Sequence, residues 1–253
     1  MSSNAPSELA LETRGVVMTY RGNGEPSLAG LDLAIPAGAL FGLLGPNGAG
    51  KTTAISIMST ILTPTAGEVR IFGLDVRRHG RQVKAMLGLV PQELAIYQPL
   101  TAAENLRFFG RLYGLSGAEL KRRIGECLEF VGLADRGDQL VHTFSGGMKR
   151  RLNLAAGILH QPRLLFLDEP TVGIDAQSRN LILDRLAHLN EQGTTMIYTT
   201  HYMEEAERLC SEVAIIDMGK IVAGGKPCDL IRDGGHDSLQ ELFFALTGRK
   251  LRD

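Results

Sequence analysis

The chain has 253 residues, 44% hydrophobic and 22% charged, which is typical of a globular protein with one large domain or a core carrying a subdomain. Its 27 Lys and Arg residues nearly balance its 28 Asp and Glu residues, so no global basic field draws it to nucleic acid, and we expect no nucleic-acid partner. Three cysteines without CxxC spacing argue against a disulfide framework or a zinc site and fit a reducing cytoplasm.

The sequence also argues against a membrane-spanning or exported chain. No apolar run reaches the roughly 18–20 residues that cross a bilayer. Residues 1–12 have neither the basic start nor the apolar centre of a secretion signal. If the chain acts in transport, we expect another polypeptide to supply the channel.

The first ninety residues alternate between predicted strands and a helix. Residues 9–20 and 28–35 read as strands separated by a polar, Gly-rich turn. Residues 39–44 form an apolar run typical of a buried parallel strand. A glycine-rich loop follows, and then Ile55, Met58 and Leu62 recur at helical spacing. This order of strand, loop and helix is the context that a phosphate-binding loop requires.

The loop between that strand and helix matches the pattern G-xxxx-G-K-T. Its glycines let backbone N–H groups turn toward phosphate oxygens, and the following helix adds the positive end of its dipole. We expect Lys51 to hold the β- and γ-phosphates of ATP and Thr52 to offer its hydroxyl to Mg²⁺. The alternative, a glycine-rich turn beside an ordinary lysine, is disfavoured by the flanking elements. The predicted nucleotide-binding residues are Gly45, Pro46, Asn47, Gly48, Ala49, Gly50, Lys51, Thr52 and Thr53.

Residues 91–160 have a helical character. Helices are expected to begin at Thr101, Ser116 and Ser145, the first two with a Glu three residues later, as in a capping box. The basic clusters at residues 121–123 and 149–151 read as solvated helix faces in preference to a lipid or nucleic-acid patch. The residues expected to face inward are Leu106, Phe109 and Tyr113, then Leu120, Ile124, Cys127 and Val131, then Met148, Leu152, Ala155 and Leu159.

A second apolar strand, at residues 164–167, ends in Asp168 and Glu169. In open α/β sheets ligands sit at the carboxyl ends of the strands. A carboxylate at Asp168 can hold Mg²⁺, directly or through water, and Glu169 can act as the general base for the attacking water. An acidic pair after a strand is often a solvated strand end, but the upstream phosphate loop favours the functional interpretation.

Strands return toward the end of the chain. Residues 195–199 form a β-rich run, and residues 213–217 and 220–223 read as a hairpin. From Ser238 onward, Leu239, Leu242, Phe243 and Leu246 share one face, which predicts a helix docked on the body and not a membrane anchor. Alternating strands and helices predict an α/β core with a helical insertion.

With these motifs in order, residues 9–226 resemble the nucleotide-binding subunits of ATP-binding-cassette (ABC) transporters. The most specific match is the run FSGGMKRR at residues 144–151, which resembles the ABC signature. A Ser-Gly-Gly at a helix start is physically an anion site, since it combines a hydroxyl, free N–H groups and a helix dipole. The resemblance implies that this segment contacts the γ-phosphate of ATP bound to the opposite subunit. Its candidate residues are Ser145, Gly146, Gly147 and Met148.

Four further residues take a role only through the resemblance. Gln92 matches the Q-loop glutamine, which senses Mg²⁺ and water, and His201 matches the switch histidine at the γ-phosphate; alone they would read as a loop residue and a structural histidine. Tyr20 matches the aromatic ring stacked on adenine, with a half-buried strand-end tyrosine as the alternative. Asp175 lies in a segment like the D-loop, which crosses the dimer interface. The implied catalytic residues are Glu169, His201 and Gln92, and the implied Mg²⁺ ligands are Thr52, Gln92 and Asp168.

The resemblance also implies a fold and its division. We expect a phosphate-loop NTPase (RecA-like) α/β fold: a parallel-sheet core, an N-terminal antiparallel β subdomain and an inserted α-helical subdomain. Residues 1–253 would form a single ABC ATPase domain. Within it, residues 1–90 and 161–225 would form the ATP-binding core, residues 91–160 the helical signature subdomain, and residues 226–253 a short helical tail.

The expected function is Mg-ATP hydrolysis in a head-to-tail dimer, coupled to transport by a separate membrane permease. The signature departs from the family pattern, because Met148 replaces the usual Gln and Phe144 the usual Leu. This form is similar to daunorubicin-resistance and nodulation-factor exporters, which implies an ABC-2-type permease, export, and a location on the cytoplasmic face of the cell membrane. The second cassette would be another copy or a sister ATPase subunit. The alternative is a soluble ABC-type ATPase acting on DNA or ribosomes, disfavoured by the short insertion and the balanced charge.

Overall fold

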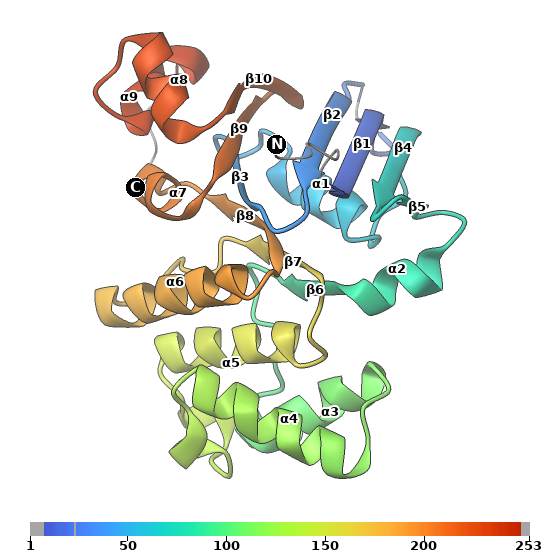
Figure 1. Ribbon diagram of the computed structural model, residues 1–253, viewed down its shortest axis with the longest axis vertical. Helices are drawn as coiled ribbons and strands as arrows, with labels where there is room; N and C mark the ends of the chain where they lie inside the picture. The colour runs from blue at the N-terminus through green and yellow to red at the C-terminus, as the bar shows by residue number, and fades with distance from the viewer. Residues whose placement is uncertain (1–7, 23, 249–253) are drawn as a thin grey trace, which may run out of the picture.

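The computed structural model describes residues 8–22 and 24–248. Two sheets lie side by side, with a group of helices at one end of the molecule and a helical pair at the other (Figure 1). Residues 1–7, which make up most of the stretch predicted to lack a secretion signal, lie outside the described residues. So do residues 249–253 of the predicted tail.

The smaller sheet is antiparallel and follows the order β2-β1-β4-β5. In its first strand Leu11, Thr13 and Val16 are buried and Arg14 is exposed, so one face packs on the core and the other meets solvent. This arrangement confirms the predicted N-terminal antiparallel β element. The strands are β1 (Leu9–Met18), β2 (Leu28–Pro36), β4 (Ala66–Ile71) and β5 (Leu74–Asp75).

The larger sheet follows the order β10-β9-β3-β8-β7-β6. All neighbouring strands in it are parallel except the hairpin of β9 and β10. Every residue of β3, β7 and β8 is buried, as expected for parallel strands covered on both faces. The carboxyl ends of these three strands therefore meet at one edge. The strands are β3 (Leu40–Leu44), β6 (Leu87–Val90), β7 (Leu164–Asp168), β8 (Thr195–Thr200), β9 (Glu212–Asp217) and β10 (Lys220–Gly225).

The helices fall into three groups (Figure 1). Helices α3, α4 and α5 gather at one end of the molecule, α8 and α9 gather at the other, and α1, α2, α6 and α7 lie around the sheets. The helices are α1 (Lys51–Met58), α2 (Gly80–Met86), α3 (Ala102–Leu112), α4 (Gly117–Phe130), α5 (Gly146–Ile158), α6 (Ala176–Glu191), α7 (Met203–Leu209), α8 (Pro227–Gly234) and α9 (Leu239–Thr247). Two short 3₁₀ turns, Ala134–Arg136 and Val141–Thr143, connect α4 to α5.

Two hydrophobic cores hold these layers together. One joins the antiparallel sheet and α1 to the parallel sheet, with Phe166 and Ile197 fully buried in it. The other joins the parallel sheet to α3 through α6 and includes Leu152 and Tyr198. The middle and carboxyl-terminal part of α5, including Leu152 and Ala155, packs into the second core, which anchors the helix that carries the signature at its N-terminus.

The predicted helix caps are only partly confirmed. Thr101 and Glu104 form the full capping box, and the Ser145 hydroxyl accepts a hydrogen bond from Met148 N at 3.2 Å. Ser116 is the N-cap of α4 but makes no side-chain cap bond. Helix α1 ends at Met58 and not near Leu62, because Thr60 adopts a left-handed φ of 67°, which a helix cannot continue.

Two side chains predicted to be buried are exposed. Tyr113 is 41% exposed because it is the C-cap residue of α3, and its ring stacks on His160 with centroids 3.5 Å apart. Leu246 is 40% exposed in the last turn of α9, although Leu239, Leu242 and Phe243 are buried as predicted. Both residues lie at helix ends. The hydrophobic periodicity of the sequence continues to these positions, but the buried face of each helix ends before them.

The remaining expectations concern membranes and cysteines. Within the described ranges, no helix has the length and apolar character to span a membrane. Cys127, Cys210 and Cys228 are all free thiols, the first two buried and the third exposed.

Candidate functional site

The glycine-rich loop connects the end of β3 to the start of α1, at the edge where the parallel strands end. Gly50 adopts a φ of 107°, and a Cβ there would lie 2.6 Å from Ser27 O, so only glycine fits. A Cβ on Gly45 would lie 2.4 Å from Ile216 O. The turn of the β9–β10 hairpin supports the loop, since Gly219 N donates to Ala49 O at 3.0 Å. The loop is therefore wedged between two elements, with its N–H groups near the start of α1.

Lys51 is the first residue of α1 and is only 6% exposed. Its ammonium donates to Gly45 O at 2.7 Å and Pro46 O at 3.2 Å, and it lies 3.8 Å from a Glu169 carboxylate oxygen. Burial lowers the pKa of Lys51 from its ordinary value, while the charges of Glu169 and Asp168 oppose this shift. A buried cation inside a curled glycine loop is well placed for phosphate, whose oxygens can replace these backbone acceptors.

Glu169 lies where three other predicted site residues converge. One carboxylate oxygen, Oε2, accepts from Gln92 Nε2 at 3.3 Å and lies 3.2 Å from His201 Nδ1, while Oε1 faces Lys51. The side chain is 9% exposed. Glu169 also has a φ of 46°, a strained conformation of the kind found at functional sites. The structure thus brings together Lys51, Gln92, Glu169 and His201 from four separate segments.

Thr199, which the sequence did not single out, positions both acidic residues. Its hydroxyl donates to Asp168 Oδ1 at 2.6 Å and accepts from Glu169 N at 3.0 Å. The Thr199 carbonyl accepts from the same N–H at 3.1 Å, which stabilises the strained turn. Asp168 pairs with Thr199 across β7 and β8, so strand pairing was the signal that could have revealed the contact.

We expect Thr199→Val to impair hydrolysis more than folding. The valine has nearly the same shape but removes the hydroxyl from Asp168 and Glu169, which should lower the free energy of unfolding by about 1–3 kcal/mol. The misplaced carboxylates should lower the ATPase rate about tenfold or more. Steady-state ATPase assays and urea unfolding check both numbers.

Thr195→Val is the matched control, because Thr195 is buried on the same strand and its hydroxyl accepts from Gly38 N at 2.9 Å, at the opposite end of β8. It should cost similar stability and leave turnover unchanged. Equal losses of activity in the two variants would contradict a positioning role for Thr199.

The signature segment lies at the N-terminus of α5. Ser145 and Gly146 are exposed, whereas Gly147 is buried, and a Cβ on it would lie 2.1 Å from the Ser178 hydroxyl. Met148 packs partly into the larger hydrophobic core, so the methionine contributes apolar contact where the family pattern has an amide. In the described part of the chain, no hydrogen bond or ion pair joins this segment to Lys51 or Glu169.

The basic clusters are only partly the solvated faces that the sequence predicts: Lys121 and Arg122 are exposed, whereas three arginines bind backbone carbonyls. Arg150 donates through Nη1 to Gln92 O and through Nε to Val172 O at 3.3 Å, so it links the Q-loop to the segment after β7. Arg151 donates to Val131 O at 3.0 Å, and Arg123, only 12% exposed, donates to Leu159 O at 2.9 Å. The carbonyls bound by Arg151 and Arg123 lie at helix ends, where backbone C=O groups lack an intrahelical partner, and those bound by Arg150 lie in loops; charge counting along the sequence cannot detect such contacts.

Three other predicted residues lie near the start of a helix. The Tyr20 hydroxyl is 3.2 Å from Thr53 Oγ1, and its ring is 37% exposed beside the phosphate loop. Thr52 is exposed next to Lys51. Asp175 caps α6 by accepting from Ser178 N at 2.8 Å, and this hydrogen bond lowers the pKa of its carboxyl group.

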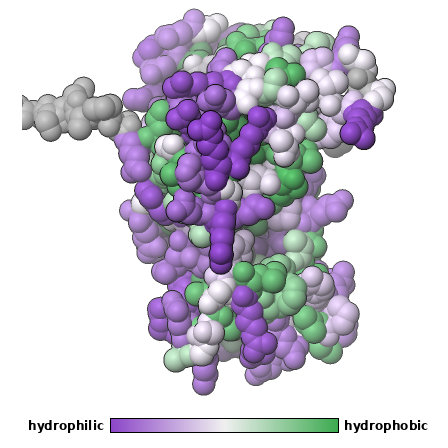
Figure 2. All heavy atoms as spheres, turned by 90° about the vertical axis from the view of Figure 1, so that its right-hand side faces the viewer, coloured by the Kyte–Doolittle hydropathy of each residue, from purple (hydrophilic) through white to green (hydrophobic). Residues whose placement is uncertain are grey.

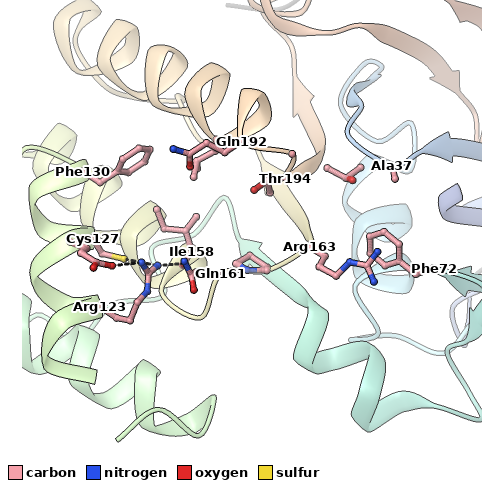
Figure 3. Close-up of a pocket in the computed structure, with 15 residues that line it drawn as sticks. Ala37, Phe72, Arg123, Cys127, Phe130, Ile158, Gln161, Arg163, Gln192 and Thr194 are labelled. Atoms are coloured by element: carbon pink, nitrogen blue, oxygen red, sulfur yellow. Dashed lines mark hydrogen bonds and ion pairs between the residues drawn. The ribbon is translucent and has the colours of Figure 1, made fainter. Parts of the chain in front are cut away.

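A separate cavity lies at the opposite edge of the parallel sheet (Figure 3). It has a volume of about 430 Å³ and is lined by Arg163 and Thr195, next to or at the starts of β7 and β8, and by Phe130 at the end of α4. Because the phosphate loop follows the carboxyl end of β3, this cavity is remote from the predicted ATP site.

Comparison with known proteins identifies the family. The family model described as "ABC transporter" matches residues 28–172. The linearmycin resistance ATP-binding protein LnrL of Bacillus subtilis (strain 168) is 49% identical over 213 residues, covering 84% of this chain and 68% of the relative. The daunorubicin/doxorubicin resistance ATP-binding protein DrrA of Streptomyces peucetius is 43% identical, covering 91% and 69%.

A third relative and a solved structure point to the same family. Nod factor export ATP-binding protein I of Cupriavidus metallidurans (strain CH34) is 45% identical over 86% of this chain and 74% of the relative. A solved structure of an ATP-binding subunit of an ABC transporter superposes with a TM-score of 0.84 at 29% identity, covering 94% of this chain and 99% of that one. These matches confirm the resemblance and the fold expected from the sequence motifs. The chain therefore belongs to the ABC transporter family, as an ATP-binding and ATP-hydrolysing subunit.

Proposed function

We propose that Glu169 is the general base of ATP hydrolysis and that Lys51 holds the phosphates. The observation that supports this assignment is the convergence of Lys51, Gln92 and His201 on the two oxygens of one buried carboxylate. Water attacks the γ-phosphorus, the bond to the bridging oxygen of ADP breaks, and the water proton passes to Glu169. His201 and Gln92 orient the carboxylate and the water.

The donors around Asp168 suit Mg²⁺. Its carboxylate lies at the end of β7 with Oδ1 bound by Thr199, and the exposed Thr52 hydroxyl follows Lys51. Mg²⁺ favours one or two protein oxygens together with phosphate oxygens and water, so Thr52 and Asp168 are fitting ligands, with Gln92 near the attacking water. When bound, the ion would neutralise charge that develops on the phosphates.

The second cassette is, in this proposal, another copy of the chain. One chain carries both half-sites: the phosphate loop with Glu169, and the signature with Ser145 at a helix N-terminus. Since no hydrogen bond or ion pair joins the signature to the phosphate loop of the same chain among the residues that the structure describes, a head-to-tail dimer would let Ser145 and Gly147 contact the γ-phosphate held by the partner. Asp175, at the start of α6, would lie at that interface, and the Tyr20 ring would stack on adenine.

The transport partner is proposed to be a separate ABC-2-type permease, with the chain bound to its cytoplasmic face and cargo moving outward. The names of the relatives, which refer to antibiotic resistance and Nod factor export, support export. Residues 91–160 would move against the core as one subdomain and transmit the ATP-dependent change. A soluble ATPase acting on DNA or ribosomes is not favoured by relatives of this kind.

A groove of about 970 Å³ between the core and α3 is the proposed permease site. Ile61 and Leu112 line it and are 61% and 68% exposed, and Arg81 and Lys84 of α2 add positive charge. Figure 2 views the molecule from the side of α2 and shows hydrophobic side chains gathered on its lower half. Exposed large apolar side chains beside a groove mark a protein contact, and we infer an amphipathic permease segment with acidic flanks.

The test is to tag the chain in its native cell and identify the proteins recovered from solubilised membranes. We expect a multi-helix permease in near-equal amount. Leu112→Asp should lower that recovery about tenfold or more, because a charge is placed in an apolar contact, and should leave the ATPase rate of the free chain unchanged. The control, Leu246→Asp, alters an exposed apolar residue on α9 and should recover the permease normally.

Recovery from the soluble fraction with ribosomes or DNA would overturn the transport proposal. Normal permease recovery with Leu112→Asp would leave the transporter assignment intact and would rule out the groove as the docking site.

A further inference from the structure

Glu205 is a buried carboxylate that the mechanism above does not use. It lies in the first turn of α7, four residues after His201, and is 5% exposed. A single oxygen, Oε2, accepts three hydroxyl hydrogen bonds, from Tyr198 at 2.6 Å, Thr200 at 2.8 Å and Thr171 at 3.1 Å. Hydrogen bonds to an ionised acceptor are about twice as strong as neutral ones, so this cluster is a rigid point in the fold.

The three donors come from the two segments that carry the catalytic pair. Tyr198 and Thr200 lie on the strand that leads directly into His201. Thr171 is two residues after Glu169 in the loop that follows β7. Glu205 therefore links the strand end before His201 to the loop after Glu169. The His201 Nδ1 and Glu169 Oε2 atoms lie 3.2 Å apart.

Thr199 and Thr200 make hydrogen bonds on opposite faces of β8. Successive side chains on a strand point to opposite faces, so Thr199 binds Asp168 and the Glu169 N–H while Thr200 binds Glu205. The Thr200 hydroxyl also accepts from Tyr202 N at 3.0 Å, which fixes the turn on the far side of His201. The residues on both sides of His201 in the sequence are therefore fixed by hydrogen bonds.

The charge of Glu205 has a partner. The other oxygen, Oε1, lies 3.7 Å from Arg179 Nε, and the Arg179 guanidinium stacks on the Tyr202 ring at 4.6 Å from its centroid. The centroid of the Tyr202 ring lies 4.2 Å from that of the His201 ring. Burial, followed by the charge of Glu205, raises the pKa of Tyr198 well above its ordinary value, so the phenol stays protonated and remains a donor.

We propose that Glu205 is a positioning residue for ATP hydrolysis: by accepting hydroxyl bonds from Thr171, Tyr198 and Thr200, it fixes His201 against Glu169. A buried ion pair is often no more stabilising than a well-packed apolar group, so stability alone is a weak reason for this cluster. The proposal rests on the proposed roles of Glu169 and His201, because Glu205 acts only through the geometry of that pair.

The test compares kcat and KM for ATP in Glu205→Gln, His201→Ala and the double variant, with thermal melting of each. Glu205→Gln keeps the side-chain shape but loses the charge, and we expect kcat about tenfold lower with KM for ATP within about twofold. In the His201→Ala background, the same change should have no further effect. The control Glu204→Gln, at the exposed neighbour on the same helix, should match the wild type.

The outcomes separate this inference from the proposed function. If Glu205→Gln keeps the wild-type kcat, or lowers it by the same factor with and without His201, the inference is overturned. If His201→Ala and Glu169→Gln leave turnover unchanged, the proposed function fails first. Should Glu205→Gln not fold, Thr171→Val replaces it in the same test, since it removes only the hydroxyl that links Glu205 to the loop after Glu169. We then expect kcat to fall about threefold, and this fall should disappear in the His201→Ala background. A wild-type kcat in Thr171→Val would overturn the inference.

Discussion

Glu169→Gln should bind ATP with near-native affinity and hydrolyse it at least about 100-fold more slowly. Glutamine keeps the size of the side chain and can keep contacts to Gln92 and His201, which both lie near Oε2. It cannot take the proton from the attacking water, so the loss falls on kcat and not on binding. Steady-state phosphate release and equilibrium titration with a fluorescent ATP analogue measure the two quantities separately.

The control for this change is Glu191→Gln, at the exposed end of α6, which should leave both quantities unchanged. Near-native turnover in Glu169→Gln would contradict the assignment and move the base elsewhere, with His201 as the first candidate. A loss of ATP binding instead of turnover would show that the carboxylate serves mainly to organise the phosphate loop around Lys51.

Lys51→Ala should weaken ATP binding by about 2–3 kcal/mol, or roughly 100-fold, because it removes charge-assisted hydrogen bonds to phosphate. It also removes the cation that lies 3.8 Å from Glu169 and within reach of the loop carbonyls of Gly45 and Pro46. An unpaired buried carboxylate is costly, so we expect a lower melting temperature in the same variant. Calorimetric ATP titration and thermal melting check both effects.

Lys220→Ala is the matched control, since Lys220 is exposed on β10 and should change neither measurement. Lys51→Arg should fail as well, because the enclosed loop has little room for a planar guanidinium. Retention of native affinity by Lys51→Ala would contradict the proposed phosphate contact.

The parts of the site that the sequence predicts well are those built from contiguous residues. The phosphate loop, the acidic pair after β7 and the signature each combine a short motif with the element that carries it, so the order of strand, loop and helix was readable. The hydrophobic runs of β3 and β7 are buried throughout, and this made their parallel placement predictable.

The parts that the sequence did not predict depend on distant contacts. Thr199 and Glu205 look ordinary along the chain, and their roles appear only when β7 and β8 pair and α7 packs beneath them. Arg150 is similar, because its carbonyl partners lie 58 and 22 residues away. Several elements, among them the two-residue strand β5 and the seven-residue helix α2, are too short to show a clear hydrophobic periodicity in the sequence.

The helical errors have a common cause. Tyr113 and Leu246 continue the apolar period of α3 and α9 but lie at or next to the helix ends, where both side chains stay largely exposed. Periodicity identifies the face that packs and does not show how far along the helix the packing extends.

In the proposed mechanism, ATP is held between the phosphate loop of one chain and the signature of another. Sedimentation of Glu169→Gln with Mg-ATP and with Mg-ADP detects this arrangement, because blocked hydrolysis should preserve the closed dimer. We expect a dimer that forms with ATP, is absent with ADP, and is lost when Ser145→Arg is added. A protein that stays monomeric at saturating ATP, or a dimer that survives Ser145→Arg, would contradict this arrangement.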